Sequence, residues 1–214
     1  MTLTQGSQRA DKSDDVLYRQ YLKGDTASYD ELMIRYGDRL TFYLHGYLHD
    51  VNDAEDLMIE AFARIMAKKP KITEGAFKAY LYKTARNLAL RLQDRKRKLQ
   101  VFSIDSMDSD LAAIVLSTGV APEDVTGFSP PGKSSPVEED IGQAERNQVL
   151  HLCLERIEPE LREALWLIYF EGLSYSQAAS VMKVNSKKID HLLQRGKRQM
   201  REELAIEGVM NAYE

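Results

Sequence analysis

The spacing of apolar residues constrains the fold of this chain more than any other feature of its sequence. Over residues 27–48, large apolar side chains recur at intervals of three and four, which places them on one face of an α-helix. The same period recurs over residues 54–66, 77–92 and 189–204. No stretch of useful length alternates apolar and polar residues as a β-strand does. The sequence therefore predicts an all-α protein.

An acidic, proline-rich segment interrupts the helical pattern. Four of the six prolines lie at positions 122–136. Residues 101–140 carry eight acidic side chains and a single lysine, which gives them a net charge of −7. Proline ends helices, and a polar, charged composition of this kind is typical of linkers. We therefore predict a long, acidic, flexible linker over residues 100–140, between two small helical domains at residues 14–99 and 141–207.

The first predicted domain contains four helices, whose ends are marked by capping residues and by glycine or proline. They are a short helix that stops at Gly24, a helix over residues 27–48 capped by Asp25 or Thr26, one capped by Asn52 or Asp53 that ends at Pro70, and one over residues 76–97. The last of these becomes strongly basic at its end.

The second predicted domain ends in a helix-turn-helix, after helices over about residues 140–156 and 159–172. Ser174 and Gln177 have the spacing of a capping box at the start of a short helix. A turn at residues 183–185 leads into a longer helix with one apolar stripe and a basic outer face. Two helices joined in this way are typical of a motif that places its second helix in the major groove of DNA.

The net charge of −4 conceals two strongly basic segments. Residues 83–98 and residues 183–201 each carry seven basic side chains and one acidic side chain. Near a polyanion the local charge matters more than the total, because salt screens interactions beyond about 8 Å. Each segment is therefore a candidate nucleic-acid-binding surface. A basic face on an amphipathic helix is also typical of a helix that is only exposed to solvent.

Composition and motifs argue against an enzyme. His45 and His49 are the best candidates for metal ligands, but no catalytic glutamate lies between them, and no glycine-rich phosphate loop occurs. The single cysteine, Cys153, allows no internal disulfide and lies at an apolar helical position. No apolar run approaches the roughly 20 residues of a membrane helix. We expect a cytoplasmic protein with no cofactor, no metal, no membrane insertion and no catalytic activity.

The order of motifs in the two predicted domains carries a family resemblance. Asp53-Ala54-Glu55-Asp56-Leu57 is followed by Glu60 and then, further along the chain, by Ala79-Tyr80-Leu81-Tyr82, Ala85-Arg86-Asn87-Leu88-Ala89 and a run of arginine and lysine. Together with the helix-turn-helix, this order resembles the extracytoplasmic-function (group IV) sigma factors of bacterial RNA polymerase, in the sigma-70 family. The resemblance covers about residues 14–98 and 141–205.

The resemblance implies a promoter-specificity subunit with a region 2-like and a region 4-like domain. Its partners would be core RNA polymerase, through the clamp and flap, promoter DNA, and an anti-sigma factor. The polymerase-binding residues implied are Asp53, Glu55, Asp56, Leu57 and Glu60. Those implied for recognition and melting of the minus-ten element are Tyr80, Tyr82, Arg86, Asn87, Arg95, Lys96, Arg97 and Lys98.

For the minus-thirty-five element, the chemistry of the second helix agrees with the resemblance. Side chains near the start of a recognition helix reach base edges, and later basic residues contact phosphates. The residues implied are Ser186, Lys187, Lys188, His191, Gln194, Arg195, Lys197 and Arg198. Three features depart from the common family pattern: Asp190 and Leu192 lie in the recognition helix, Lys183 stands where glycine is frequent, so that a positive φ there would add strain, and Ile59 stands where glutamine is common. They identify a divergent member.

Two alternatives remain open on the sequence. One is a helix-turn-helix regulator that binds duplex DNA without the polymerase, and the other is a polymerase-binding protein without promoter activity. The basic end of the fourth predicted helix favours the sigma factor, because an effector or dimerisation domain has no need of it. For the acidic linker two roles stay open: it threads a basic channel of the polymerase, or it is a spacer.

Overall fold

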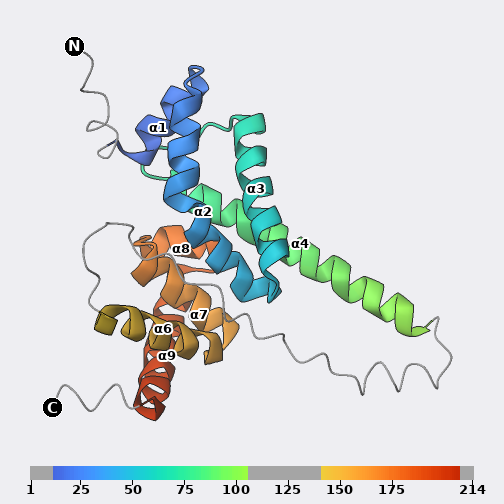
Figure 1. Ribbon diagram of the computed structural model, residues 1–214, viewed down its shortest axis with the longest axis vertical. Helices are drawn as coiled ribbons and strands as arrows, with labels where there is room; N and C mark the ends of the chain where they lie inside the picture. The colour runs from blue at the N-terminus through green and yellow to red at the C-terminus, as the bar shows by residue number, and fades with distance from the viewer. Residues whose placement is uncertain (1–11, 106–140, 208–214) are drawn as a thin grey trace.

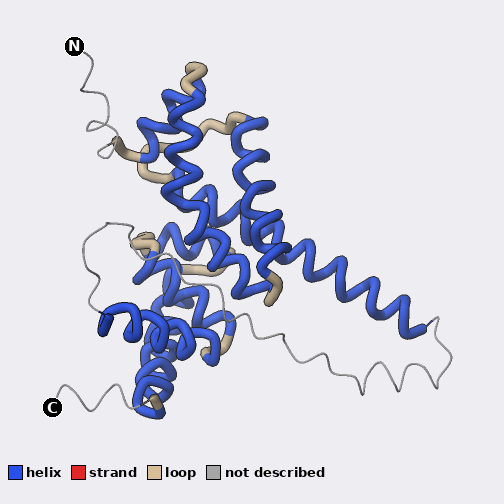
Figure 2. The backbone as a smooth tube through the Cα atoms, viewed as in Figure 1, coloured by secondary structure: helices blue, strands red, loops and turns tan. Residues whose placement is uncertain are grey.

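The computed structural model describes residues 12–105 and 141–207, and within these ranges the backbone consists of helices joined by short loops, with no strand (Figure 2). The N-terminal half, residues 12–105, contains α1 (Asp14–Leu22), α2 (Thr26–Leu48), α3 (Val51–Lys68) and α4 (Phe77–Asp105). The C-terminal half, residues 141–207, contains α6 (Ile141–Arg156), α7 (Pro159–Leu165), the π-helical turn η1 (Trp166–Phe170), α8 (Tyr175–Met182) and α9 (Ser186–Ile206). The predicted all-α class is confirmed.

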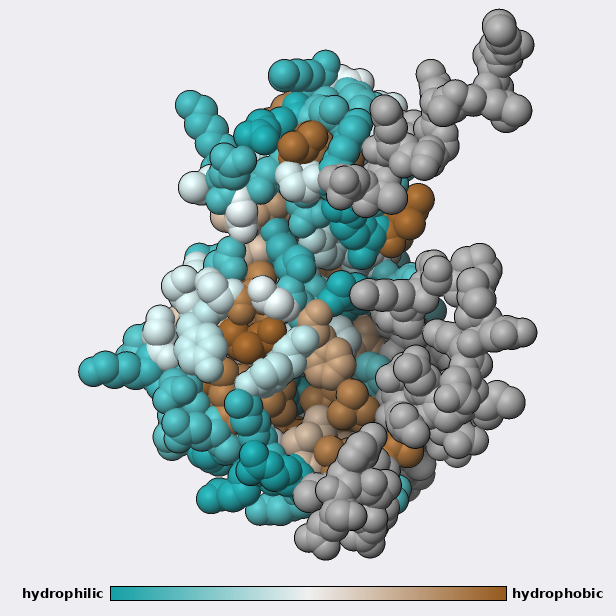
Figure 3. All heavy atoms as spheres, turned by 90° about the vertical axis from the view of Figure 1, so that its left-hand side faces the viewer, coloured by the Kyte–Doolittle hydropathy of each residue, from teal (hydrophilic) through white to brown (hydrophobic). Residues whose placement is uncertain are grey.

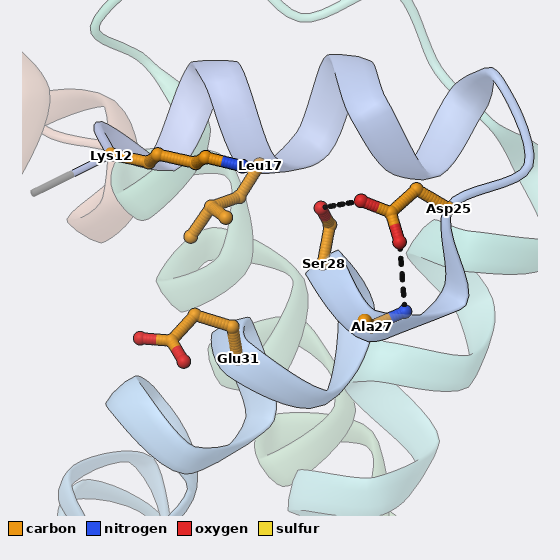
Figure 4. Close-up of a pocket in the computed structure, with 6 residues that line it drawn as sticks. All are labelled: Lys12, Leu17, Asp25, Ala27, Ser28 and Glu31. Atoms are coloured by element: carbon orange, nitrogen blue, oxygen red, sulfur yellow. Dashed lines mark hydrogen bonds between the residues drawn. The ribbon is translucent and has the colours of Figure 1, made fainter. Parts of the chain in front are cut away.

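The start of α2 agrees with the sequence. Asp25 is in extended conformation, and its carboxylate accepts hydrogen bonds from the amide nitrogen of Ala27 at 3.1 Å and the hydroxyl of Ser28 at 2.8 Å. Figure 4 shows this cap at the edge of a small polar cavity between α1 and α2, which Lys12 and Glu31 also line. A carboxylate at this position satisfies amide groups that have no partner within the helix.

The start of α3 differs from the prediction. The capping residue is Asp50, whose carboxylate accepts from the amide of Asp53 at 3.0 Å, so the helix begins at Val51. The predicted cap at Asn52 or Asp53 was wrong by two or three residues. The reason is that His49 adopts a left-handed conformation with φ of 52°, which ends α2 and turns the chain at once into the next helix.

Helix α4 is longer than the sequence predicts. The apolar period suggests an end near residue 97, whereas the helix continues to Asp105. Residues 100–105 are therefore helical, although they were assigned to the acidic linker. Figure 1 shows the second half of α4 extending away from the rest of the molecule. The remainder of the predicted linker, residues 106–140, lies outside the described residues.

The helix-turn-helix is confirmed by its caps. The hydroxyl of Ser174 accepts from the amide of Gln177 at 3.2 Å, and the Gln177 side chain accepts from the amide of Ser174 at 2.9 Å, which completes the capping box. Lys183 ends α8 with φ of 58°, so the turn keeps the left-handed conformation that favours glycine although a lysine stands there. Asn185 then caps α9 by accepting from the amide of Lys188 at 2.8 Å.

The two halves pack against one another and share a continuous apolar core. Helix α4 lies against α8, and α2 contacts α7. Within the C-terminal half α7 and α9 approach so closely that a Cβ atom on Gly196 would lie 3.1 Å from the Leu165 side chain. Figure 3 shows the molecule from the left-hand side of Figure 1, with apolar side chains gathered in the lower part of the view. None of the described helices is both long and apolar enough to cross a membrane.

Candidate polymerase and nucleic-acid interfaces

Helix α3 presents an acidic face to solvent. Glu55 and Asp56 are exposed, and Glu60 accepts a hydrogen bond at 2.8 Å from Arg64, one turn further along. Leu57 is only 7% exposed, because its side chain packs into the core of the N-terminal half. Leu57 is therefore a core residue in this structure, while the acidic side chains remain accessible to a basic partner.

The first half of α4 divides the predicted minus-ten residues between two faces. Tyr80 is exposed at 37%, and Asn87 is half-buried. Tyr82 and Arg86, which lie one turn apart on the other face, point toward the C-terminal half: Tyr82 is fully buried, and the Arg86 side chain is 14% exposed. In this arrangement neither Tyr82 nor Arg86 is accessible to DNA.

The basic end of α4 is exposed along its length. Lys96 forms an ion pair with Asp53 at the start of α3, and Arg97 pairs with Asp94 at 3.2 Å. Within the described part of the chain, Arg95 and Lys98 have no carboxylate partner. Exposed pairs of this kind contribute little to stability, because water and salt compete for both charges. The cations of this run therefore stay available to exchange a carboxylate for a phosphate.

The outer face of α9 carries all eight residues that the sequence assigns to the minus-thirty-five element. Six of them are exposed: Ser186, Lys187, His191, Gln194, Lys197 and Arg198. The two half-buried ones pair with the start of α7, Lys188 with Glu160 at 3.3 Å and Arg195 with Glu158 at 2.9 Å. The Asp190 carboxylate, a departure from the family pattern, accepts from the Gln194 amide at 3.0 Å and so occupies one exposed donor.

Three charged residues at the junction of the two halves, Arg39, Glu163 and Glu171, were missed by sequence reasoning, and the partner of Arg86 was not foreseen. Arg39 on α2 pairs with Glu171, which follows η1, at 3.1 Å, and Arg86 on α4 pairs with Glu163 on α7 at 2.7 Å. Both glutamates are buried. In the sequence, only Glu163 gave a signal. It lies close to the apolar positions Leu161 and Ala164, in a part of the helix expected to pack against a neighbour, where an acidic side chain is unusual.

The two histidines considered as metal ligands lie near the end of α2. Their ring centres are 6.3 Å apart, and burial lowers the pKa of His45 below its ordinary value. No set of three side chains able to hold a metal ion occurs within residues 12–105 and 141–207. Cys153 is buried in the C-terminal half, and burial raises the pKa of its thiol.

Comparison with known families agrees with the arrangement of both halves. The family model of sigma-70 region 2 matches residues 32–99, from α2 into the basic end of α4. The model of sigma-70, region 4, matches residues 147–200, which include the helix-turn-helix. Together the two models account for more than half of the chain, in the order that the sequence predicts.

Curated relatives match over most of the chain. The ECF RNA polymerase sigma factor SigE of Mycolicibacterium smegmatis is 28% identical over 188 residues, which are 85% of this chain and 65% of that protein. The RNA polymerase sigma-H factor of Pseudomonas aeruginosa is 27% identical over 176 residues, covering 80% of this chain and 83% of that protein. The chain thus spans about two thirds of the first relative and most of the second.

Solved structures have the same fold. CnrH, in complex with the cytosolic domain of CnrY, superposes with a TM-score of 0.56 at 16% identity, over 91% of this chain and 99% of that chain. The sigma factor RpoE of Bartonella quintana, in complex with the anti-sigma factor NepR, gives 0.55 at 20% identity, over 83% and 97%. With both regions matched in order and relatives that are ECF sigma factors, the chain belongs to the sigma-70 family.

Proposed function

We propose that this chain is a sigma factor, which binds core RNA polymerase, recognises the minus-thirty-five and minus-ten promoter elements and directs transcription initiation. The observation that carries the proposal is the succession, in one chain, of an acidic α3, a long α4 with a basic end, and a helix-turn-helix with a basic outer face. A regulator that binds duplex DNA alone needs the last of these, but not the first two. The two sigma-70 regions support the same choice.

Each surface then has a separate task in the predicted domains. The exposed carboxylates of α3 meet a basic surface on the polymerase clamp, where complementary charge speeds association and sets the orientation. In the domain of residues 14–99, α4 binds the minus-ten element. Its basic side chains contact the DNA backbone, and its aromatic side chains stack on unstacked bases. Helix α9, in residues 141–207, enters the major groove of the minus-thirty-five element.

The chain supplies recognition, while bond formation belongs to the polymerase, so it acts in the cytoplasm without a cofactor. An anti-sigma protein is a further partner that a neighbouring structure supports, because RpoE of Bartonella quintana is in complex with the anti-sigma factor NepR. The promoter sequence is set by α9 and α4 together, and the Asp190–Gln194 contact alters the donors that α9 offers to base edges.

The first experiment combines polymerase binding with transcript mapping. The purified full-length chain is mixed with bacterial core RNA polymerase, tested for co-elution, and then used for run-off transcription of fragmented genomic DNA. The proposal expects co-elution and transcripts that start downstream of one shared two-element sequence. Failure to bind the core enzyme, with specific binding of duplex DNA by the chain alone, would instead support the regulator.

The role of α3 is tested by charge reversal. Replacing Glu55→Lys and Asp56→Lys should weaken polymerase binding by about tenfold or more, equal to about 1.4 kcal/mol, because repulsion replaces attraction at the clamp. The control Asp30→Lys reverses an exposed carboxylate on α2. Circular dichroism should show that all three chains stay helical. Equal affinity of the reversed and control chains would remove α3 from the interface.

A further inference from the structure

The exposed face of α9 holds one acidic side chain among its cations. Residues 186–201 of this helix contain six lysines and arginines, and Asp190 is the only acid among them. Asp190 is exposed, and it lies three residues after Lys187 and four before Gln194, so the three side chains share one face of the helix. Near DNA, phosphates repel a carboxylate and attract the neighbouring cations. Unless a contact with DNA compensates for that repulsion, Asp190 weakens binding by the face that carries it.

Ion pairs with α7 narrow the set of side chains that α9 offers to a base edge. Lys188 pairs with Glu160 at 3.3 Å and Arg195 pairs with Glu158 at 2.9 Å, so both cations are held at the start of α7. Side chains near the start of a recognition helix are the ones that reach bases. The exposed side chains of residues 186–194 are Ser186, Lys187, Asp190, His191 and Gln194. Asp190 therefore lies in the middle of the surface that would enter the groove.

Gln194 holds the Asp190 carboxylate in one orientation. Its amide nitrogen donates a hydrogen bond to Oδ2 of Asp190 at 3.0 Å, across one turn of the helix. In the described part of the chain, neither Oδ1 of Asp190 nor the amide oxygen of Gln194 accepts a hydrogen bond. A pair of this kind on an exposed helix face adds little to stability. It does, however, present two acceptor oxygens and a single remaining N–H to whatever approaches the helix.

The major groove offers only two kinds of donor to such a carboxylate. They are the amino groups at N4 of cytosine and N6 of adenine, whereas guanine presents N7 and O6 and thymine presents O4, all of which are acceptors. On adenine the N7 acceptor lies beside the amino group, and it repels a nearby carboxylate. The edge of cytosine carries no acceptor next to N4. Cytosine is therefore the base whose edge best matches Asp190.

We propose that Asp190 recognises a cytosine in the minus-thirty-five element by accepting a hydrogen bond from N4, and that Gln194 is the positioning residue that orients its carboxylate. The inference rests on the proposed function, because it names one base that α9 recognises. Guanine or thymine in place of the cytosine sets an acceptor against the carboxylate, so repulsion adds to the loss of the hydrogen bond. Asp190 thus contributes specificity, although it lowers the attraction of the helix for phosphates.

The test separates base recognition from overall affinity. The full-length chain is assembled with core RNA polymerase, and the holoenzyme selects from a promoter library in which the mapped minus-thirty-five element is randomised. Sequencing of the selected DNA gives the base preference at each position. At the position that Asp190 contacts, the parent chain should prefer cytosine, on one strand, about tenfold over the other bases.

Substitutions identify that position and its readers. Asp190→Ala should reduce the preference for cytosine to about twofold or less there and leave every other position unchanged. Gln194→Ala should weaken the preference at the same position, because the carboxylate remains but loses its fixed orientation. The matched control Glu202→Gln removes an equal charge from the exposed face of the same helix, 3.9 Å from Arg198, and should change no base preference. Adenine at the altered position, an equal effect of Asp190→Ala at every position, or no effect overturns the inference.

A modified base tests the atom itself, so that the outcome does not depend on how well a variant folds. In N4-methylcytosine a methyl group replaces the N–H that faces the major groove, while pairing with guanine is kept. At the altered position it should weaken binding of the parent holoenzyme about tenfold and that of the Asp190→Ala holoenzyme much less. Equal weakening of both overturns the inference while the proposed function stands. Failure of the parent chain to bind core polymerase removes the proposed function, and the same selection with the chain alone on duplex DNA then tests Asp190.

Discussion

At the scale of single residues, the availability of a cationic side chain for DNA depends on how far its ion pair is exposed to solvent. Arg86 and Lys96 are both on α4 and were both assigned to DNA. Arg86 is enclosed with a buried glutamate, whereas the ion pair of Lys96 with Asp53 is exposed to solvent. Exposed pairs exchange partners at little cost, and enclosed pairs do not unless the enclosing surfaces part. Lys96 can therefore exchange its partner for a DNA phosphate directly, whereas Arg86 can do so only when the two halves separate.

His151 makes a prediction about pH. Burial lowers its pKa below the ordinary value of about 6.5, so the unfolded chain takes up the proton first as pH falls. The stability that this group contributes is complete above pH 6.5 and is lost as pH falls through the lowered pKa. We expect the free energy of unfolding, measured with urea at pH 7.5 and at pH 5.5, to fall less in His151→Phe than in the parent chain. An equal fall in both chains would contradict the assignment.

At the scale of elements, α8 and α9 each begin at a residue whose side chain caps the helix. Replacing Ser174→Ala removes the acceptor of the capping box and should cost about 1 kcal/mol of stability. The control Ser176→Ala removes a hydroxyl from the same helix, one that bonds only the hydroxyl of Ser174. Urea denaturation compares the two. If Ser176→Ala loses as much stability, the hydrogen bond between the two hydroxyls, and not the capping box, accounts for the loss in Ser174→Ala.

The basic end of α4 makes a prediction about salt. Replacing Arg95, Lys96, Arg97 and Lys98 with alanine should abolish promoter opening. It should also reduce the salt dependence of single-strand binding, with the slope of log affinity against log salt falling by about 3 if each cation contacts one phosphate. Footprinting of open complexes and titrations at several salt concentrations provide the measurements. Unchanged open-complex formation would remove this run from the minus-ten interface.

The helices were predictable because their signals are local. The apolar period and the caps at Asp25 and Ser174 depend on neighbours within one turn, and the structure confirms them. The start of α3 was missed because Asp50 caps the helix directly after the left-handed His49, a backbone conformation that no apolar period reveals. The extra length of α4 was missed for a related reason: once the helix leaves the core, no buried stripe marks its end.

At the scale of the whole molecule, the pairing of the halves was not predictable from local signals. The sequence predicts two domains separated by a linker, and no local pattern indicates that helices of one domain pack against helices of the other. Contacts such as Phe42 with Trp166 or Tyr43 with Glu163 join residues more than one hundred positions apart. They depend on which helix faces meet after both halves have folded. The candidate DNA-binding residues were therefore identified by type, but the burial of Tyr82 and Arg86 could not be foreseen.

The continuous core makes a prediction about cooperativity. The parent chain should unfold by heat in a single transition, with equal calorimetric and van't Hoff enthalpies, because neither half retains its full apolar contacts alone. Opening the junction with Glu163→Gln and Glu171→Gln should split the transition into two. Differential scanning calorimetry tests this, with Asp30→Asn as the control. Two transitions in the parent and control chains would show that the halves are already independent.

The length of chain between α4 and α6 determines whether the contact between the two halves depends on protein concentration. Asp105 and Ile141 are joined by 35 residues, which span about 120 Å at most when fully extended. The contact between the two halves is intramolecular, so any equilibrium between joined and separated halves is independent of dilution. A larger amount of this chain therefore leaves the ratio of joined to separated halves unchanged. A surface that competes for either face, on DNA or on the polymerase, can therefore shift the balance between joined and separated halves, whereas the amount of this chain cannot.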